Sequence, residues 1–161
     1  MRLRLVVALM ASLAASPAAA EWRISSSKDR LTDKESKVAT LEAKAPDHNV
    51  SARLVVRCLA DKLVGGLTLS IETSARFYPG RMGLRYRVDG REPVPRYMPV
   101  DATGSGMSLW ADTDELRGAR RIRVELEPYR APNLFFDFDL TGVDKAFASI
   151  PCNRTKPKWE P

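Results

Sequence analysis

Residues 83–90 read Gly-Leu-Arg-Tyr-Arg-Val-Asp-Gly and hold the clearest alternating pattern in the chain. The apolar side chains Leu84, Tyr86 and Val88 alternate with two arginines. A period of two places the apolar side chains on one face of a β-strand and the arginines on the other, because successive side chains of a strand point to opposite faces. The Asp-Gly pair that follows is typical of a tight turn between antiparallel strands. The stretch therefore predicts a half-buried strand that enters a hairpin.

Short strands are predicted on both sides of this stretch. Each candidate is rich in branched or aromatic side chains or alternates apolar with polar residues, and turn residues separate neighbouring candidates. The predicted strands cover residues 22–25, 38–43, 52–59, 62–73, 107–111, 121–127 and 133–141. Pro93 and Pro95 are expected to keep the stretch after the hairpin turn irregular or at a sheet edge. The pattern indicates a mainly β fold, a single antiparallel sandwich or barrel-like domain.

One helix is predicted, over residues 142–150. Thr141 is its expected N-cap, and Pro151 ends it. Four apolar side chains fall on one side of this segment at helical spacing: Val143, Ala146, Phe147 and Ile150. Residues 112–116 predict one capped turn of helix at most. The fold is therefore expected to carry a short C-terminal helix beside its strands.

Residues 1–20 have the three-part layout of a cleavable secretory signal. Arg2 and Arg4 give a positive start, and residues 5–15 form a largely apolar stretch that is too short to span a bilayer. Ser-Pro-Ala-Ala-Ala at residues 16–20 then supplies a helix breaker and the small side chains that a signal peptidase accepts. We expect cleavage after residue 20.

The expected organisation is a signal peptide over residues 1–20, an exported β-rich domain over 21–152 and a flexible tail over 153–161, which holds two prolines and three basic residues. The predicted destination is the periplasm, with release outside the cell as the alternative. No later segment approaches the length of a membrane span, so we expect no stable membrane insertion.

Two cysteines, Cys58 and Cys152, remain in the exported part. An even number in an oxidising compartment favours one disulfide, and two free thiols or intermolecular pairing are the alternatives. The bond would close a loop of about 95 residues, for which chain entropy gives up to about 4–5 kcal/mol. It would join the end of the predicted helix to a central strand. No Cys-x-x-Cys spacing points to redox catalysis.

The charge balance is mildly basic. The chain has 26 Lys and Arg against 20 Asp and Glu, a formal charge of +6, and loss of Arg2 and Arg4 with the leader lowers it to +4. Nucleic-acid binders usually carry a denser cationic stripe with stacking aromatics, so a nucleic-acid partner is not expected. A weak preference for anionic surfaces, such as headgroups or polymers, fits this charge.

Arginines supply the candidate binding surface. Arg85, Arg87 and Arg91 flank the predicted hairpin turn, and a second group follows later in the chain: Arg117, Arg120, Arg121 and Arg123. If their strands adjoin, the guanidinium groups would form a cationic face able to hold carboxylates or phosphates in a bidentate manner. The alternative is an ordinary solvated strand face on which the arginines pair with nearby acidic side chains.

The candidate catalytic residues are three carboxylates and one histidine. Asp137 and Asp139 lie two apart on a predicted strand, which places both on one face, and Glu115 could join them in the two-carboxylate arrangement of a glycosidase. The alternative is an outward polar face opposite a phenylalanine core. The single histidine, His48, lies in a polar run without a nucleophile motif. One histidine and two cysteines are too few for a zinc site, and no nucleotide-binding glycine loop occurs, so no metal or cofactor is expected.

Five groups of short motifs follow one another through the exported part. They are Trp22-x-Ile24 with Lys28-Asp29-x-Leu-Thr-Asp33, the strand end Arg57-Cys58, the strand Arg85-Tyr86-Arg87-Val88-Asp89, Leu116-x-x-Ala119 with Ile122-x-Val124, and Phe136-x-Phe138-x-Leu140-x-Gly142 before a helix that ends at Cys152. This order resembles the VasI/TagO-like family of periplasmic proteins associated with type VI secretion. Met98 departs from it, because the family carries an aromatic, usually Trp, near this position, for which Tyr97 could substitute.

The resemblance implies a small β-rich fold without established catalysis, placed beside an envelope-spanning machine. Together with the residues, it predicts a non-catalytic periplasmic accessory or binding protein. The partner would be an envelope or secretion-system protein that docks on a sheet edge or on the arginine-lined face. The alternatives are a cell-wall polymer hydrolase that uses Asp137, Asp139 or Glu115, and a secreted inhibitor protein. The sequence does not indicate an oligomeric state.

Overall fold

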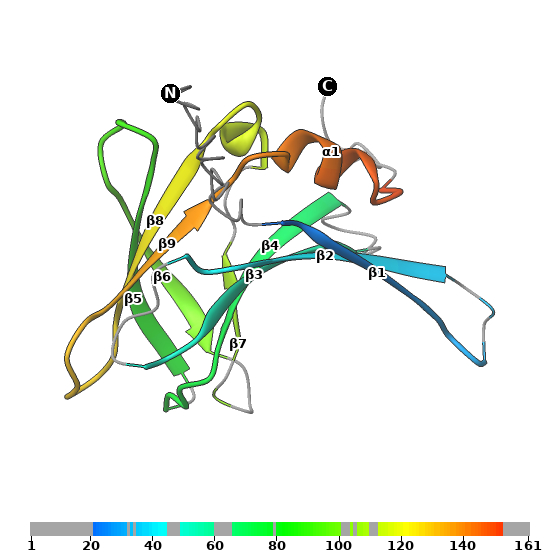
Figure 1. Cartoon of the computed structure of the whole chain (residues 1–161). Helices are drawn as coiled ribbons and strands as arrows, with labels where there is room; N and C mark the ends of the chain where they lie inside the picture. Colours follow the sequence, from blue (N-terminus) through cyan, green and yellow to red (C-terminus); the bar gives the residue numbers. More distant parts are fainter. Residues whose placement is uncertain are drawn as a thin grey trace, which may run out of the picture.

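The computed structural model describes residues 21–31, 33, 35–44, 49–59, 66–78, 80–100, 104, 106–109 and 113–152. The predicted signal peptide, the predicted tail and His48 lie outside the described residues. The elements, in chain order, are β1 (Arg23–Lys28), β2 (Glu35–Glu42), β3 (Ala52–Leu59), β4 (Gly66–Thr73), β5 (Gly80–Val88), β6 (Val94–Val100), β7 (Gly106–Leu109), a 3₁₀ turn η1 (Thr113–Leu116), β8 (Arg121–Glu127), β9 (Leu134–Asp139) and α1 (Val143–Ala148). The fold is mainly β, as the sequence predicts (Figure 1).

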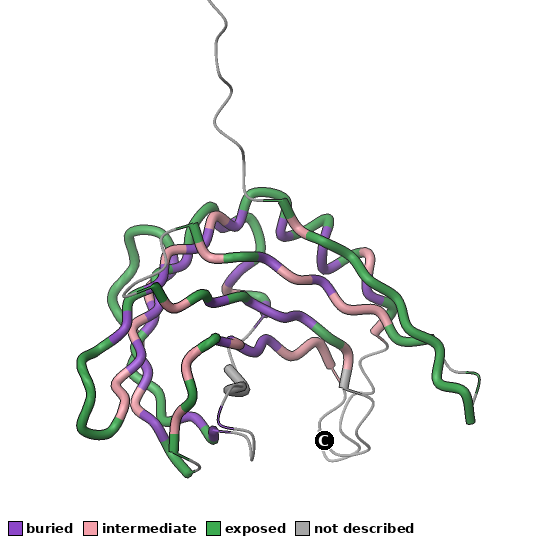
Figure 2. The backbone as a smooth tube through the Cα atoms, turned by 60° about the horizontal axis from the view of Figure 1, so that its bottom comes forward, coloured by how far each residue is buried: buried purple, intermediate pink, exposed green. Residues whose placement is uncertain are grey.

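The strands pair in the order β1-β2-β3-β4-β7-β6-β5-β8-β9, and every pair is antiparallel. Two halves can be distinguished, because among the described residues β6 and β7 share one residue pair only, Val100 with Met107. The strands curve over as an arch in Figure 2. The backbone N–H of Lys44, just after β2, donates to the carbonyl of Asp137 in β9 at 2.7 Å. The two halves therefore approach each other again, which gives a sandwich-like or barrel-like domain.

The core lies between the two halves and beneath α1 and η1. Alternation produces it directly: in β5 the apolar side chains of residues 84, 86 and 88 are buried while Arg85 is exposed. The same alternation buries residues 122, 124 and 126 of β8 and residues 134, 136 and 138 of β9. Leu116 from η1 and Phe147 from α1 belong to the same cluster. The inward faces predicted from the period of two are confirmed.

The predicted disulfide joins Cys58 of β3 to Cys152, with the two Cα atoms 5.3 Å apart. It holds the end of α1 against β3. The buried side of α1 contains Val143, Ala146 and Phe147, as helical spacing predicts. The ring of Phe147 also meets Trp22 edge to face, with 6.5 Å between ring centroids. The helix thus covers one end of the core, and in Figure 1 it lies at the top of the molecule.

One local prediction is wrong, and another agrees with the structure in only one of its two forms. The N-cap of α1 is Gly142 in a left-handed conformation (φ 84°), with no side-chain cap from Thr141. A left-handed backbone suits glycine because it has no Cβ. Of the two expectations for the stretch that contains Pro95, irregular chain is wrong, since this stretch is a regular strand, β6, and a sheet edge agrees with the pairing. Its prolines are tolerated because β6 pairs along its length with β5 but almost nowhere with β7, so that most of its second side is an edge.

The position at which the resemblance expects an aromatic is an inward one. Met98 is buried in the core, whereas its neighbour Tyr97 points outward and is exposed. Since successive strand residues face opposite sides, Tyr97 does not replace a core aromatic here. The flexible thioether of Met98 fills the space instead.

Candidate functional site

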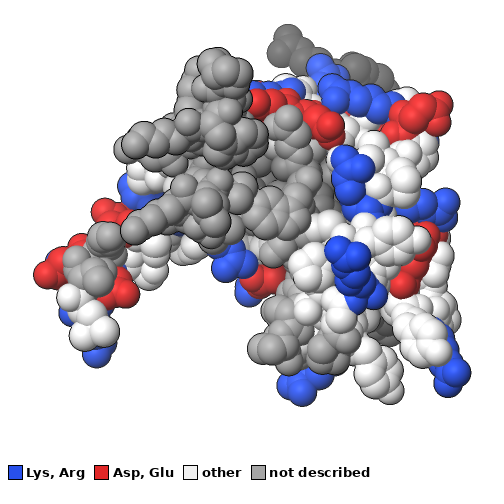
Figure 3. All heavy atoms as spheres, turned by 180° about the vertical axis from the view of Figure 1, so that it is seen from behind, with Lys and Arg blue, Asp and Glu red and all other residues white. Residues whose placement is uncertain are grey.

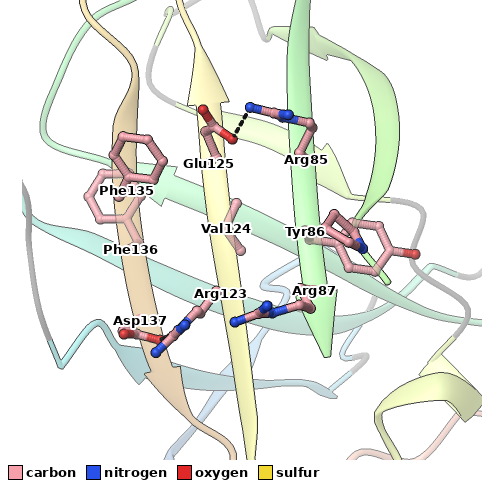
Figure 4. Close-up of a pocket in the computed structure, with 10 residues that line it drawn as sticks. Arg85, Tyr86, Arg87, Arg123, Val124, Glu125, Phe135, Phe136 and Asp137 are labelled. Atoms are coloured by element: carbon pink, nitrogen blue, oxygen red, sulfur yellow. Dashed lines mark hydrogen bonds and ion pairs between the residues drawn. The ribbon is translucent and has the colours of Figure 1, made fainter. Parts of the chain in front are cut away.

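The predicted arginine face exists because β5 and β8 are adjacent strands. In their register, Arg85 lies opposite Glu125, and Arg87 lies opposite Arg123. Both arginines of β5 point to the outer face, toward β8, whereas Tyr86 between them points to the other side (Figure 4). We call Arg85, Arg87, Arg121 and Arg123 the arginine face. A concavity of about 410 Å³ lies over it and is bordered by Pro93 and Phe135.

Arg85 is neutralised at its end of the arginine face. Its Nη2 lies 2.6 Å from Oε2 of Glu125, and its Nε lies 3.1 Å from Oε1 of Glu127. Asn133 adds a hydrogen bond of 2.8 Å to the Glu125 carboxylate. Burial acts to raise the pKa of Glu125, but the bonds from Arg85 and Asn133 outweigh it, so the pKa lies below its ordinary value. Arg85, Glu125, Glu127 and Asn133 therefore form an ion-pair cluster in which the charge of Arg85 is compensated within the chain, and we call such a cluster closed.

Asp137 of β9 neutralises two further arginines. Arg121 donates two hydrogen bonds to the Asp137 carboxylate, one from Nε at 2.7 Å and one from Nη2. Nε of Arg123 donates to the same carboxylate at 3.3 Å. Burial acts to raise the pKa of Asp137, but the hydrogen bond and charge of Arg121, with a smaller contribution from Arg123, bring it below its ordinary value. Asp137 therefore acts as a structural counter-ion.

Arg87 has a different environment. It is half-buried, and it makes no hydrogen bond or ion pair with any residue that the structure describes. The side chain directly across the strand pair is Arg123, whose single carboxylate partner also holds Arg121. Like charges directly opposite each other destabilise a sheet. The centre of the arginine face thus holds a cation that lacks a counter-ion within the described chain, beside the concavity.

Two of the other arginines named from the sequence, Arg91 and Arg117, have their contacts elsewhere, whereas Arg120 lies near Arg121 and Asp137. Arg91 lies in the turn after β5 and donates to the carbonyl of Glu115 at 3.4 Å. Arg117 pairs with Asp114 at 3.2 Å, and its guanidinium also lies over the ring of Phe147. The predicted set of Arg85, Arg87 and Arg91 is therefore divided, and Arg121 and Arg123 take the place of Arg91.

The three candidate catalytic carboxylates have different surroundings. Asp139 accepts hydrogen bonds from Lys44 at 2.7 Å and from the hydroxyl of Thr141 at 2.6 Å. These bonds lower the pKa of Asp139 to about 2. Glu115 accepts a hydrogen bond of 3.1 Å from the phenol of the buried Tyr86, on the inner side of β5. Burial, followed by this bond, raises the pKa of Tyr86. A general acid at neutral pH needs a raised carboxyl pKa, and both aspartates have the opposite shift.

Replacing Asp139 by asparagine is expected to remove part of the pH dependence of stability. A carboxyl whose folded pKa of about 2 lies below the unfolded value of 3.8 stabilises the fold above pH ~4, and this contribution is lost as the pH falls toward 2. Because Lys44 is half exposed, we expect about 1 kcal/mol rather than the full value of the shift. Urea unfolding at about pH 7 and pH 3 measures it.

Asp33 provides the matched control for Asp139. It forms a Lys–Asp pair of the same length, 2.7 Å, with Lys28, but both side chains are exposed. Asp33→Asn should change the unfolding free energy by less than about 0.5 kcal/mol at either pH. Equal effects of Asp33→Asn and Asp139→Asn at pH 7 would contradict the assignment of Asp139 as the more stabilising carboxylate.

Sequence reasoning missed several parts of this region. Lys44 bonds Asp139 from a position far along the chain, and Asn133 bonds Glu125 from the neighbouring strand end, and no motif marks either of them. Phe135 is 54% exposed beside the arginine face, and only its outward place in the β9 alternation signals it. Figure 3 shows basic and acidic side chains interspersed over the half of the molecule that contains β5, β8 and β9. Local pairing, rather than total charge, therefore distinguishes Arg87.

Among the described residues, no group of His, Cys, Asp and Glu side chains could hold a metal ion. Within the same ranges, no helix is long and apolar enough to cross a membrane.

Comparison with known proteins does not assign this chain to a family. No protein-family model, curated protein or solved structure matches this chain. The resemblance to the VasI/TagO-like family therefore stays a prediction.

Proposed function

We propose that the protein is a non-catalytic binding protein of the bacterial periplasm, exported by residues 1–20, which docks an acidic segment of an envelope protein on its arginine face. The observation that carries the proposal is the half-buried Arg87, which lies opposite Arg123 and lacks a carboxylate partner among the described residues. A carboxylate from a partner would remove the repulsion between the two guanidinium groups and satisfy the planar donors of Arg87.

The surroundings of Arg87 support a protein segment as the ligand. Pro93 and the exposed ring of Phe135 border the same concavity, so that apolar contacts lie beside the cation. Protein interfaces commonly combine an aromatic or arginine anchor with a polar rim. The closed clusters at Glu125 and Asp137 form such a rim, because they hold charge that is already compensated. The type VI secretion apparatus is the partner class that the sequence resemblance implies.

Charge reversal at Arg87 is expected to reduce recovery of the partner at least about tenfold, because a buried contact would become a repulsion. Arg85→Glu should also weaken binding, since it places a carboxylate beside Glu125 and Glu127 on the same face. The measurement is crosslinking of the tagged protein in its native host, followed by mass spectrometry of the captured proteins and by a melting curve of each variant.

Arg53→Glu is the matched control. Arg53 is an exposed strand arginine paired with Glu72 at 2.6 Å, but it lies on β3 in the other half of the sheet. It should leave capture unchanged. If both Arg85→Glu and Arg87→Glu leave capture at the wild-type level while the variants remain folded, the arginine face is not the docking surface.

A further inference from the structure

A second pocket lies at the end of the domain opposite α1. In Figure 1 the β4–β5 and β8–β9 connections both lie toward the lower end of the molecule, and residues of both line the pocket. The pocket has a volume of about 540 Å³, within the range of sites for small molecules. Met82 and Leu134 from the core form its floor, and Phe77 and Pro132 contribute walls. It shares none of its lining residues with the arginine face.

Two tyrosines border the pocket and lie open to solvent. Tyr78 is 81% exposed and Tyr129 is 72% exposed, although each ring could cover a large apolar area. The guanidinium of Arg130 lies 5.0 Å from the centroid of the Tyr129 ring, which helps to orient that ring. Exposed aromatic rings around an apolar floor are typical of a binding site rather than of an ordinary surface.

The charge of the pocket has one sign. Arg76 and Arg81 both line it, and no Asp or Glu is among the lining residues that the structure describes. Neither arginine forms an ion pair or hydrogen bond with any part of the chain that the structure describes. This contrasts with Arg85, Arg121 and Arg123, each of which has a carboxylate partner. An occupant with negative charge would therefore gain two guanidinium contacts without displacing an internal partner.

The wall at Phe77 is held by a backbone contact that only glycine permits. The N–H of Phe77 donates to the carbonyl of Gly104 at 2.8 Å. Gly104 has a φ of +73°, and a Cβ at this position would lie 2.4 Å from the carbonyl oxygen of Phe77. Any other residue would have to move the backbone at the pocket wall. This contact therefore fixes the backbone at one wall of the pocket, which lowers the entropic cost of binding there.

We propose that this pocket binds an anionic amphiphile, a small molecule with an apolar chain or ring and a carboxylate or phosphate at one end. The apolar part lies on Met82 and Leu134 between the two tyrosines, and the anionic group meets Arg76 and Arg81. The site is distinct from the proposed docking surface, because the two pockets share no lining residue, although β5 and β9 contribute to both.

Calorimetric titration of the full exported protein with decanoate, decyl phosphate and 1-decanol tests the proposal. The two anions share the apolar chain of the alcohol, so the difference isolates the head group. Both arginines should favour an anion, and we expect at least about tenfold tighter binding of one or both anions than of the alcohol, which corresponds to about 1.4 kcal/mol. The tighter anion identifies the head-group class, carboxylate or phosphate.

The double variant Arg76→Glu and Arg81→Glu should lose that preference and leave binding of 1-decanol unchanged. Both side chains are exposed, so the fold should persist, and the neutral pair Arg76→Gln and Arg81→Gln guards against a folding defect. Arg53→Glu is the control for total charge. Equal affinity for the anions and the alcohol, an anion preference that survives both double variants, or no binding by either anion would each overturn the proposal.

Discussion

Replacing Cys58 and Cys152 together by serine is expected to lower the free energy of unfolding by about 4 kcal/mol. The disulfide spans a sequence separation of 94 residues, so its loss restores much conformational freedom to the unfolded chain. For a domain of this size the melting temperature should fall by about 10–20 °C. Thermal and urea unfolding of the oxidised protein and the double variant measure the effect.

Reduction of the wild type supplies the control for the disulfide prediction. Wild type in reductant should approach the double variant, and the variant itself should not respond to reductant. Loss of the disulfide should loosen α1 before the strands, because Cys152 follows this helix. The buried side chains Phe147 and Ile150 should then become more exposed. A double variant within about 1 kcal/mol of the oxidised wild type would show that core packing alone holds α1 in place.

Phe138→Ala should destabilise the fold by about 3–5 kcal/mol. The ring of Phe138 is fully buried on the inner face of β9, where it belongs to the core between the two halves. Removing it costs both the transfer free energy of the ring and the cavity that remains. Urea unfolding at neutral pH gives the difference.

Phe135 lies on the same strand and provides the matched control, because it has the same side chain but faces outward and is 54% exposed. Phe135→Ala should cost no more than about 1 kcal/mol, as most surface substitutions do. Similar losses for both variants would mean that β9 does not present Phe138 inward and Phe135 outward.

These two phenylalanines also show what the sequence could predict. Alternation alone assigned Phe138 to the core and gave β8 with the bounds that the structure has, and a run of branched side chains gave β3 with its bounds. Such predictions succeed because a one-residue shift of a half-buried strand would expose its whole apolar face. The buried side of α1 was predicted from its helical spacing, and the disulfide was predicted from the even number of cysteines. Neither prediction required knowledge of how the strands pair.

Features that depend on long-range pairing could not be predicted. Whether Arg87 meets Glu125 or Arg123 depends on the register of β5 and β8, and a shift of two residues would give the first arrangement while keeping the same faces. Lys44 reaches Asp139 across 95 residues of sequence, through the approach of the two halves. The second pocket combines segments before β5 and after β8, which no local pattern relates. The predicted N-cap of α1, Thr141, was wrong because the helix begins after Gly142, whose backbone is left-handed.

Repulsion between arginines on the arginine face lowers the stability of the fold, and the acidic side chains of the described residues compensate it only in part. Arg121 and Arg123 share one carboxylate, and Arg87 is left opposite Arg123 without another within the described ranges. A face selected for stability alone would place an acidic residue at one of these positions. The repulsion is understandable if an acidic partner completes the arrangement, and this is the central claim of the proposed function.

The most direct test of this claim compares Arg87→Glu with Asp137→Asn in the in-cell crosslinking experiment. Arg87→Glu should lower capture of the partner at least about tenfold, whereas Asp137→Asn should raise it several-fold, because it frees Arg121 and Arg123 to meet the partner's carboxylates. Opposite changes in the two variants, with both still folded, are the predicted result. Loss of capture in Asp137→Asn, or loss of a measurable cleavage of peptidoglycan that the wild type performs, would contradict it and assign the carboxylate of Asp137 to the function instead.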